Sequence, residues 1–168
     1  MEEWDLFDRD RNRLGRTIRR GESIPEGCYH LAVAICVVND EGKILLTFRD
    51  PAKEVFPSCW ENPGGAAQAG DTSTGAAVRE LREETGLEAP EAELVLLDSI
   101  WGRKGVLDVY LWRPMGEVGP IILQPGETCD YKWADLKELD RMLDAGEIAV
   151  SIVPNMRKIW PQLAAVMR

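Results

Sequence analysis

Histidine is almost absent from this chain, and closely spaced cysteine pairs are absent altogether. The 168 residues include one histidine, His30, and four cysteines that form no C-x-x-C pair. Zinc sites built from cysteine and histidine need several such ligands at short spacing, so we expect no site of this kind. The cysteines are typical of reduced, mostly buried residues in a cytoplasmic protein.

Long apolar runs are lacking as well. No stretch approaches the ~18 apolar residues that a membrane-spanning helix requires. The first residues, MEEWDLFDRDRNR, carry too many charges for a signal peptide. We therefore expect a cytoplasmic protein with no membrane partner.

Positive charge is scarce, with 20 Lys and Arg against 29 Asp and Glu and a net charge of −9. An acidic protein is repelled by nucleic-acid phosphates, so we expect no nucleic-acid partner. The segment RDRNRLGRTIRR, residues 9–20, is nevertheless basic. It is either the solvated face of a hairpin or an arm that reaches an anionic ligand, and it is also a candidate surface for a homodimer.

Length and composition are those of an ordinary globular protein. Hydrophobic residues make up 45% and charged residues 29% of the chain, which excludes a disordered chain or a coiled coil as the main architecture. At about 150 residues per domain, we expect a single domain over residues 1–168. Residues 1–27 are expected to form an N-terminal hairpin extension.

Strands and helices are mixed without regular alternation along the chain. The apolar run HLAVAICVV, residues 30–38, predicts a central strand buried on both faces. The clearest helix is expected over residues 72–85, with an N-cap among residues 71–73 and Gly86 at its end. This order favours an α/β fold with a mixed sheet between helices. The other expected elements are strands at 4–7, 14–18, 43–48, 93–101, 106–112 and 131–133, and helices at 134–145 and 154–167.

Three glutamates share one side of the predicted helix. With 100° per residue, Glu83 and Glu84 lie about −60° and +40° from Glu80. Carboxylates crowded in this way repel one another, and Mg²⁺ or Mn²⁺ relieves that repulsion. Arg79 stands four residues before Glu83 and can pair with it. The E-x-x-E-E pattern alone is also typical of a solvated helix face.

The surrounding residues make the pattern specific. From Gly65 the chain reads GAAQAGDTSTGAAVRELREETGL, which resembles the Nudix box, G-x5-E-x7-R-E-U-x-E-E-x-G-U, where U is aliphatic. The N-terminal hairpin and the strand that begins at His30 resemble the branch that includes isopentenyl diphosphate isomerases and their hydrolase relatives. The matching residues are Gly65, Arg79, Glu80, Leu81, Glu83, Glu84, Gly86 and Leu87.

Asp71 is the one departure from the box, because the family has Glu at this position. Its side chain is one methylene shorter, which leaves two interpretations open. Asp71 is either the acidic partner of Arg79 or of a metal, or it is the N-cap of the helix, a position that suits Asp.

The resemblance implies a fold and a chemistry. Nudix proteins are α/β/α sandwiches in which the box forms a loop–helix–loop, and most hydrolyse a nucleoside diphosphate linked to another moiety with Mg²⁺ or Mn²⁺. A divalent-metal-dependent pyrophosphohydrolase of a small-molecule diphosphate is implied. The implied metal ligands are Glu80, Glu83, Glu84 and a backbone carbonyl of Gly64 or Gly65, and Arg79 is implied to orient the carboxylates and to share in catalysis with Glu83.

Candidate residues also lie outside the box. Glu127 matches a position where some Nudix hydrolases place a catalytic Glu, although an exposed Glu in a turn is the alternative. Arg49 and Lys53 are candidates for binding substrate phosphates, and solvated loop cations are the alternative. Trp60 or Trp101 could stack a base, but core packing is the preferred interpretation for a Trp in a strand.

Two other functions remain as alternatives. Isomerases of this family rely on a Cys near the box and on several His ligands, whereas here residues 63–65 read PGG, Cys59 comes too early and His30 is alone. A nucleotide sensor without catalysis would be marked by loss of the box glutamates, which are intact, and Asp71 keeps that alternative open. The substrate stays open between ADP-ribose-like sugars, nucleoside di- or triphosphates and non-nucleotide diphosphates.

Overall fold

The computed structural model describes residues 2–149 and 152–167. Its central sheet has the strand order β6-β3-β8-β7. β3 (His30–Val37) runs parallel to β8 (Gly105–Trp112), whereas β6 (Gly64–Ala66) and β7 (Val95–Trp101) flank this pair as antiparallel strands. The predicted mixed sheet is confirmed.

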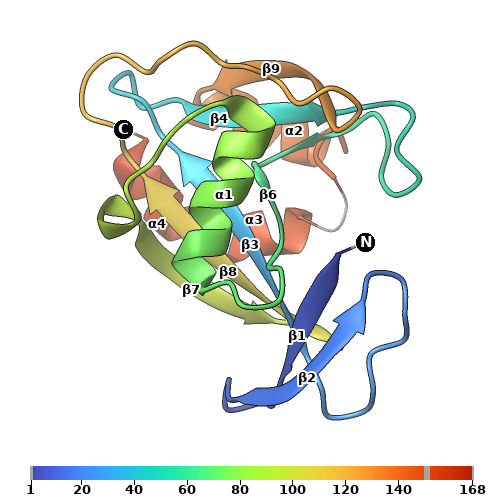
Figure 1. Ribbon diagram of the computed structural model, residues 1–168. Coiled ribbons are helices and arrows are strands. Elements are labelled where there is room, and N and C mark those ends of the chain that lie inside the picture. Colours follow the sequence, from blue (N-terminus) through green and yellow to red (C-terminus); the bar gives the residue numbers. More distant parts are fainter. Residues whose placement is uncertain (1, 150–151, 168) are drawn as a thin grey trace.

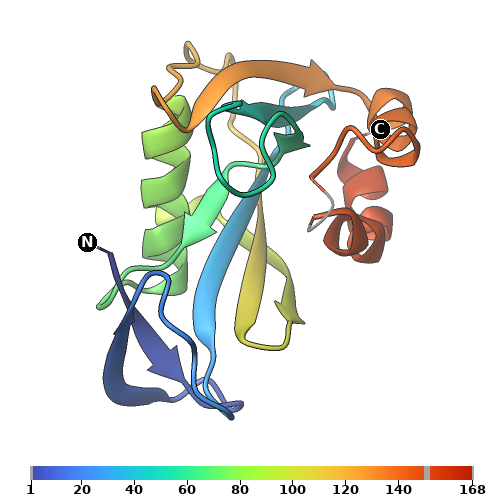
Figure 2. The same cartoon turned by 90° about the vertical axis from the view of Figure 1, so that its right-hand side faces the viewer.

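β3 is buried on both of its faces only from Ile35 onward. In its first half His30, Ala32 and Ala34 are partly buried, and His30 and Ala32 line a cavity, so the predicted burial of both faces is confirmed only in part. Leu31, Val33 and Ile35 pack with helix α1 (Ser73–Thr85) in one core cluster. Cys36 belongs to a second cluster with helices α2 (Leu136–Asp144), α3 (Val153–Lys158) and α4 (Trp160–Val166). Figure 2 shows α1 on one side of the strands and the C-terminal helices on the other, which confirms the α/β/α arrangement.

A second, antiparallel sheet has the order β5-β4-β9. It consists of β5 (Trp60–Glu61), β4 (Ile44–Arg49) and β9 (Thr128–Ala134). The bridge between Val38 and Ile44 connects it to the end of β3. This sheet brings the segments after β4 and before β9 to the same side of the molecule as the carboxyl-terminal half of α1 (Figure 1).

Local signals account for both ends of α1. The hydroxyl of Thr72 accepts a hydrogen bond from the Gly75 N–H at 3.0 Å and forms the N-cap. Gly86 has φ +73° and its N–H donates to the Arg82 carbonyl, which closes the helix. Because Thr72 caps the helix, the interpretation of Asp71 as the N-cap is wrong.

Three predicted boundaries are also wrong. The strand expected at residues 131–133 runs over Thr128–Ala134. Residues Glu91–Glu93 form a short 3₁₀ helix, so β7 begins at Val95 and not at residue 93. The expected helix over 154–167 is instead two helices that meet at Ile159. Pro161 lies in the first turn of the second helix, where it has no N–H to continue the ladder of the first.

The predicted N-terminal hairpin is present and forms a separate two-stranded sheet. β1 (Glu3–Phe7) pairs with β2 (Arg13–Arg19), and Leu6, Ile18 and Cys28 form a small core beneath them. Figure 1 shows the hairpin at the end of β3 where that strand begins, beside the loop that leads into α1. No helix in the described part of the chain is long and apolar enough to cross a membrane.

Candidate active site

The box glutamates lie on α1 next to two glycines of β6. The N–H of Gly64 donates to the Glu84 carboxylate at 3.1 Å. A Cβ atom at Gly65 would lie 2.6 Å from the carboxyl carbon of Glu80, so a larger residue cannot stand there without displacing that side chain. The two glycines therefore let the backbone of β6 approach the carboxylates closely.

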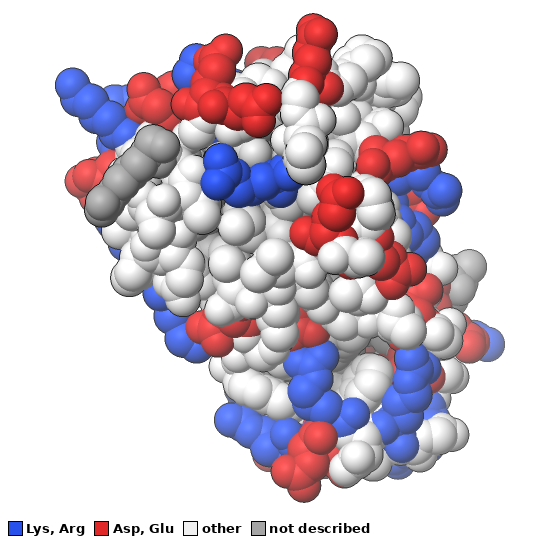
Figure 3. Space-filling view, turned by 90° about the vertical axis from the view of Figure 1, so that its left-hand side faces the viewer, with Lys and Arg blue, Asp and Glu red and all other residues white. Residues whose placement is uncertain are grey.

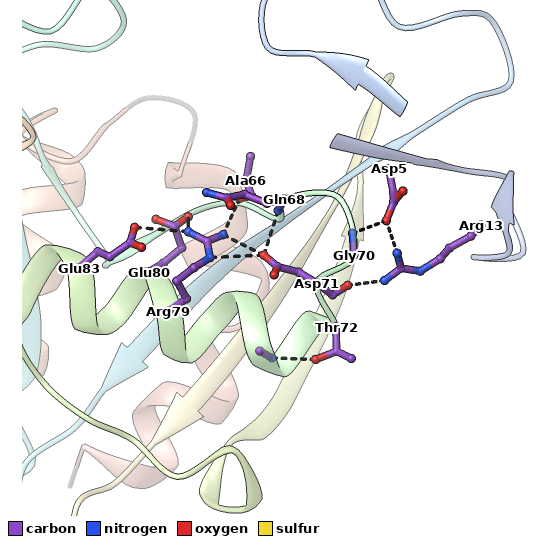
Figure 4. A network of polar contacts seen from close by, with 11 residues as sticks. Asp5, Arg13, Ala66, Gln68, Gly70, Asp71, Thr72, Arg79, Glu80 and Glu83 are labelled. Carbon is purple, nitrogen blue, oxygen red and sulfur yellow. Dashed lines mark hydrogen bonds and ion pairs between the residues drawn. The ribbon is translucent and has the colours of Figure 1, made fainter. Parts of the chain in front are cut away.

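Arg79 lies at the centre of the box contacts. Its Nη1 donates to Glu80 at 2.7 Å and to Glu83 at 3.3 Å. Its Nη2 donates to Asp71 at 3.0 Å and to the Ala66 carbonyl at 3.2 Å (Figure 4). One guanidinium thus connects the loop before α1 to two of the carboxylates, which fits the orienting role that the resemblance implies.

Asp71 reaches Arg79 in spite of its shorter side chain. Its Oδ2 accepts bonds from Arg79 Nη2 and from the Gln68 N–H, the latter at 3.0 Å. The turn before α1 directs this side chain, because the Asp71 N–H donates to the Gln68 carbonyl at 3.0 Å and the carboxylate lies between the Gln68 N–H and the Arg79 guanidinium (Figure 4). The structure therefore favours Asp71 as the acidic partner of Arg79.

Burial opposes negative charge at two of the box glutamates. Glu84 is only 7% exposed, and burial, followed by the nearby Glu61 carboxylate, raises its pKa well above the usual range. Burial also raises the pKa of Glu80, although Arg79 offsets part of the effect. Glu83 is more exposed than both. A bound cation would offset the cost of this buried negative charge.

Glu61 is a member of this cluster that the sequence analysis missed. It lies on β5, its side chain is 13% exposed, and its carboxylate accepts a hydrogen bond from Arg49 at 2.6 Å. Burial raises the pKa of Glu61 in spite of that partner. A two-residue strand carries no recognisable pattern, so only the pairing of β5 with β4 reveals this position.

A cavity of about 310 Å³ opens beside the carboxylates. Four segments far apart in the sequence line it: the hairpin, the start of β3, the region around β4 and β9, and the box. Of the predicted site residues, Asp71, Arg79 and Gly86 lie outside its lining. Those that line it are Arg49, Lys53, Gly64, Gly65, Glu80, Glu83, Glu84 and Glu127.

The two candidate phosphate-binding cations differ in the number of hydrogen-bond and ion-pair partners that they already have. Arg49 donates to Glu61 and to the carbonyls of Phe56 and Val55, so its guanidinium holds the loop after β4 in place. Among the described residues, Lys53 has one charged partner, the Glu127 carboxylate, which also lines the cavity. Lys53 is therefore the cation better placed to exchange its partner for a phosphate.

Neither tryptophan considered for base stacking lines this cavity. Trp60 packs on Phe48 with ring centroids 4.9 Å apart, and Trp101 packs edge-on against Tyr29 at 5.1 Å. Both fit the packing interpretation. Trp4 of the hairpin lines the cavity instead, a position that the sequence analysis assigned only to a short apolar strand.

The basic stretch of the hairpin is largely paired with carboxylates. Arg11, Arg13 and Arg19 pair with Asp108, Asp5 and Glu3, and Arg20 pairs with Glu2 at 3.1 Å. On the face drawn in Figure 3, blue side chains gather at the lower end, where Figure 1 places the hairpin, next to red ones. Arg11 and Arg13 connect the hairpin to β8 and to the loop before α1, whereas Arg19 and Arg20 pair within the hairpin, and Arg20 alone among them lines the cavity.

The donor set fits a hard divalent cation in its chemistry. Carboxylates and a backbone carbonyl are the oxygen ligands that Mg²⁺ and Mn²⁺ prefer, and Mg²⁺ needs only one or two protein carboxylates when phosphates complete its shell. Within residues 2–149 and 152–167, no three His, Cys, Asp or Glu side chains are close enough to hold an ion as they stand. Arg79 holds Glu80 and Glu83, and Gly64 holds Glu84, so side-chain rotation would precede binding.

Replacing Asp71 with Asn should lower activity or metal affinity by about 10- to 100-fold, the usual effect of removing a group that orients metal ligands. The amide keeps the size of the side chain but loses the charge that holds Arg79. The measurement is the Mn²⁺ dependence of turnover. Thr72→Ala is the matched control, since it removes the helix cap and leaves the contact with Arg79 in place. Unchanged metal dependence in Asp71→Asn would show that Arg79 needs no acidic partner.

Comparisons of the sequence with known proteins identify its family. The family model described as the NUDIX domain matches residues 29–156. An uncharacterized Nudix hydrolase of Listeria monocytogenes, lmo0368, is 32% identical over 148 residues, which are 88% of each chain. An isopentenyl-diphosphate Delta-isomerase of an Enterobacter species is 30% identical over 128 residues, covering 73% of this chain and 70% of that protein.

Solved structures agree with the fold. The crystal structure of DR0079 from Deinococcus radiodurans has a TM-score of 0.77 at 24% identity and covers 95% of this chain and 99% of that one. A bifunctional NMN adenylyltransferase/ADP ribose pyrophosphatase from Francisella tularensis, complexed with AMP and a Mn ion, has a TM-score of 0.61 at 18% identity and covers 83% of this chain and 43% of that one. With a family model over most of its length and the intact glutamates of the box, the chain belongs to the Nudix hydrolase family.

Proposed function

We propose that this protein hydrolyses a diphosphate linkage in a nucleoside diphosphate-linked or related phosphorylated small molecule, with Mg²⁺ or Mn²⁺ as cofactor. One observation carries the proposal: Glu80, Glu83 and Glu84 share a cavity with the Lys53–Glu127 pair. Metal-ligating oxygens, a cation for phosphate and a carboxylate for proton transfer are the groups that diphosphate hydrolysis requires.

The box residues would hold the metal. Glu80, Glu83 and Glu84 would supply carboxylate oxygens, and Gly64 or Gly65 a backbone carbonyl. When bound, a divalent cation neutralises charge on phosphate oxygens and lowers the pKa of a coordinated water. Arg79 would keep these carboxylates close to the loop that carries Asp71 while their side chains rotate toward the ion.

Outside the box, Lys53 and Glu127 would act as a pair. The Lys53 ammonium would leave Glu127 for a phosphate oxygen when substrate enters, because phosphate offers more negative charge than one carboxylate. Glu127 would then be free to accept the proton of the attacking water. Its side chain is 41% exposed and lies directly before β9, at the cavity wall. Glu83, also 40% exposed, is the alternative base.

Glu127→Gln should lower kcat by about 10²- to 10⁴-fold, the usual contribution of a general base. KM should stay level or fall, because Lys53 loses its competing carboxylate. Steady-state kinetics separates the two constants. Glu138→Gln is the control, since Glu138 also pairs with a lysine, at 3.2 Å, but on α2 and away from the cavity. A wild-type kcat in Glu127→Gln would assign the base to Glu83.

The proposal is tested with a panel of ADP-ribose, nucleoside di- and triphosphates and isopentenyl diphosphate with Mg²⁺ or Mn²⁺. Hydrolysis is followed as release of AMP and ribose 5-phosphate from ADP-ribose and as release of phosphate or pyrophosphate from the other compounds. At least one compound should be hydrolysed, and both EDTA and Glu83→Gln should stop the reaction. Binding of a nucleotide without turnover under either metal would instead support the nucleotide-sensing alternative.

An isomerase activity is less well supported by the site. Within the described residues, no cysteine lines the cavity. Cys59 lies in the loop after β4, its thiol donates to the Phe56 carbonyl at 3.0 Å, and burial raises its pKa. His30 is the chain's one histidine and stacks on Trp4. The thiol and the histidine ligands that such an isomerase needs are therefore not gathered here.

A further inference from the structure

We propose that the N-terminal hairpin positions the metal-binding carboxylates of the box, and that Asp5 and Arg13 are the positioning residues through which it does so. They act on the loop between β6 and α1, residues 67–72, whose Asp71 pairs with Arg79. This inference rests on the proposed function, because it concerns the affinity of the box for its divalent cation. Neither Asp5 nor Arg13 lines the cavity, so both act through other residues.

The tip of this loop is bonded to the first strand of the hairpin through two successive main-chain N–H groups. The Ala69 N–H donates to the Glu3 carbonyl at 2.8 Å. The Gly70 N–H donates to the Asp5 carboxylate, also at 2.8 Å (Figure 4). Gly70 has φ +94°, a left-handed conformation that glycine adopts without strain. β1 therefore fixes the two residues that come directly before Asp71.

Arg13 of β2 connects the hairpin to Asp71 itself. Its Nη1 donates to the Asp5 carboxylate and its Nη2 to the Asp71 carbonyl (Figure 4). The guanidinium presents its donors in a rigid planar fork, so the two bonds fix the main chain of Asp71 relative to β1. The Asp5 side chain is 17% exposed and also accepts the bond from Gly70, so it is itself held at two points.

Asp71 carries this constraint to the box. Its carbonyl accepts the bond from Arg13, and its Oδ2 accepts a bond from Arg79 Nη2 at 3.0 Å. An aspartate side chain is short, so its carboxylate follows any shift of its own main chain. A displacement of the loop would therefore move the acidic partner of the guanidinium that contacts Glu80 and Glu83.

The position of Asp71 matters most when a cation binds. Arg79 contacts Glu80 at 2.7 Å and Glu83 at 3.3 Å, and both carboxylates would turn away from it toward the ion. Of the described contacts of Arg79, those with Asp71 and the Ala66 carbonyl would then remain. Ligands are bound more tightly when the groups that orient them are fixed in advance. A hairpin that fixes Asp71 should therefore raise the affinity of the box for Mg²⁺ or Mn²⁺.

The test is the affinity for Mn²⁺ without substrate, measured by electron paramagnetic resonance of the free ion. Arg13→Gln should raise the Kd for Mn²⁺ by about 3- to 10-fold, less than the usual effect of removing a group that contacts the ligands, because Arg13 acts one residue further out. Asp5→Asn should weaken binding in the same direction. At saturating Mn²⁺, kcat and KM of both variants should return to within about twofold of the wild type.

A double-mutant cycle shows whether Arg13 acts through Asp71. If it does, adding Arg13→Gln to Asp71→Asn should change the Kd for Mn²⁺ by less than about twofold, because the contact with Arg79 is already weakened. A full further loss in the double variant would overturn this route. Arg19→Gln is the matched control, because Arg19 is an exposed neighbour on β2 that pairs within the hairpin. It should bind Mn²⁺ like the wild type.

The outcomes separate this inference from the proposed function. Wild-type Mn²⁺ affinity in Arg13→Gln and Asp5→Asn would overturn the positioning role and leave the hydrolase. A wild type that binds no Mn²⁺ would overturn the proposed function.

In that case, nuclear magnetic resonance of the metal-free protein still decides the positioning role. The heteronuclear NOE of the Arg79 Nε–H reports the mobility of this side chain, whose Nε donates to Asp71 at 3.3 Å. The NOE should fall in Arg13→Gln and Asp5→Asn but not in Arg19→Gln, and equal values in all of them would overturn the role. The Arg13 side chain is 43% exposed, so Arg13→Gln should fold like the wild type.

Discussion

Replacing Glu84 with glutamine should stop metal-dependent turnover and leave the metal-free protein at least as stable as the wild type. Glu84 is buried, and its one hydrogen bond from the described backbone comes from Gly64. Burial and the carboxylates of Glu61, Glu80 and Glu127 all disfavour its charge. Glutamine has the same size and still offers an oxygen to Gly64, so the variant removes the electrostatic cost together with the metal ligand.

The effect on activity should be at least about 100-fold, since the ion stabilises charge in the transition state. The effect of Glu84→Gln on stability should differ between the metal-free and the metal-bound protein. A ligand at 100 times its Kd stabilises a folded protein by ~2.7 kcal/mol, which raises Tm by several degrees in a chain of this size. Thermal melts of the wild type should show this rise between EDTA and Mg²⁺ or Mn²⁺, whereas Glu84→Gln and Glu83→Gln/Glu84→Gln should not.

Glu88→Gln is the control for these melts, because Glu88 is an exposed carboxylate just beyond the end of α1. It should respond to metal like the wild type. A Glu84→Gln protein that melts well below the wild type in EDTA would mean that the carboxylate is structural, and the assignment of a metal site to the box would then have to be withdrawn.

Arg11→Ala should lower the free energy of unfolding by about 2 kcal/mol at pH 7. Arg11 donates to both oxygens of Asp108, at 2.7 and 2.6 Å, and Asp108 is 2% exposed. Removing one partner of a buried pair costs about 3–5 kcal/mol. The loss here should be smaller, because Arg11 is about a third exposed and the hydroxyls of Ser73 and Ser99 still donate to the carboxylate.

The pH dependence of the stability lost in Arg11→Ala follows from the pKa of the Asp108 carboxyl group. Burial alone would raise the pKa of Asp108, but the hydrogen bonds from Arg11, Ser73 and Ser99 outweigh it, and the pKa is lowered. The stabilisation is therefore present above the unfolded-state pKa, about 3.9, and is lost as pH falls through the lower folded-state pKa. Urea unfolding should show a difference between wild type and Arg11→Ala that is full at pH 7 and shrinks below about pH 4.

The control for Arg11 lies on the same hairpin. Arg19 is 62% exposed and stands 3.9 Å from an exposed Glu3, so Arg19→Ala should change stability by less than about 0.5 kcal/mol at either pH. If Arg11→Ala also stays within that range at pH 7, the hairpin is held by its backbone and aromatic contacts, and the buried ion pair adds nothing measurable.

Local patterns were enough to predict the scaffold of the site. The apolar run over residues 30–38 predicted a strand of the sheet, and an N-cap among residues 71–73 together with Gly86 bounded α1 by cap chemistry that involves near neighbours only. The Nudix box could be recognised because all of its residues lie in one continuous segment of 23 residues, Gly65–Leu87, which contains α1 and its two flanking segments. Such features depend on contacts close in sequence, so periodicity and spacing are sufficient to find them.

The spacing of residues in the sequence could not predict how buried each carboxylate is. A helical wheel places Glu80, Glu83 and Glu84 on one arc, yet Glu84 is buried against β6 while Glu83 is exposed. That difference arises because the antiparallel pairing of β6 with β3 brings the backbone of Gly64 over one edge of the helix.

The sequence by itself determined the family and the mixed α/β architecture, and its resemblance to the Nudix box implied the metal ligands and the hydrolytic chemistry. Only the tertiary structure decided that Asp71 pairs with Arg79, that Glu61 joins the acidic cluster and that Trp4 faces the cavity. These three positions come from a loop, a two-residue strand and a distant hairpin. Their side chains contact the box only because of long-range strand pairing and ion pairs. Such contacts produce no periodic pattern in the sequence.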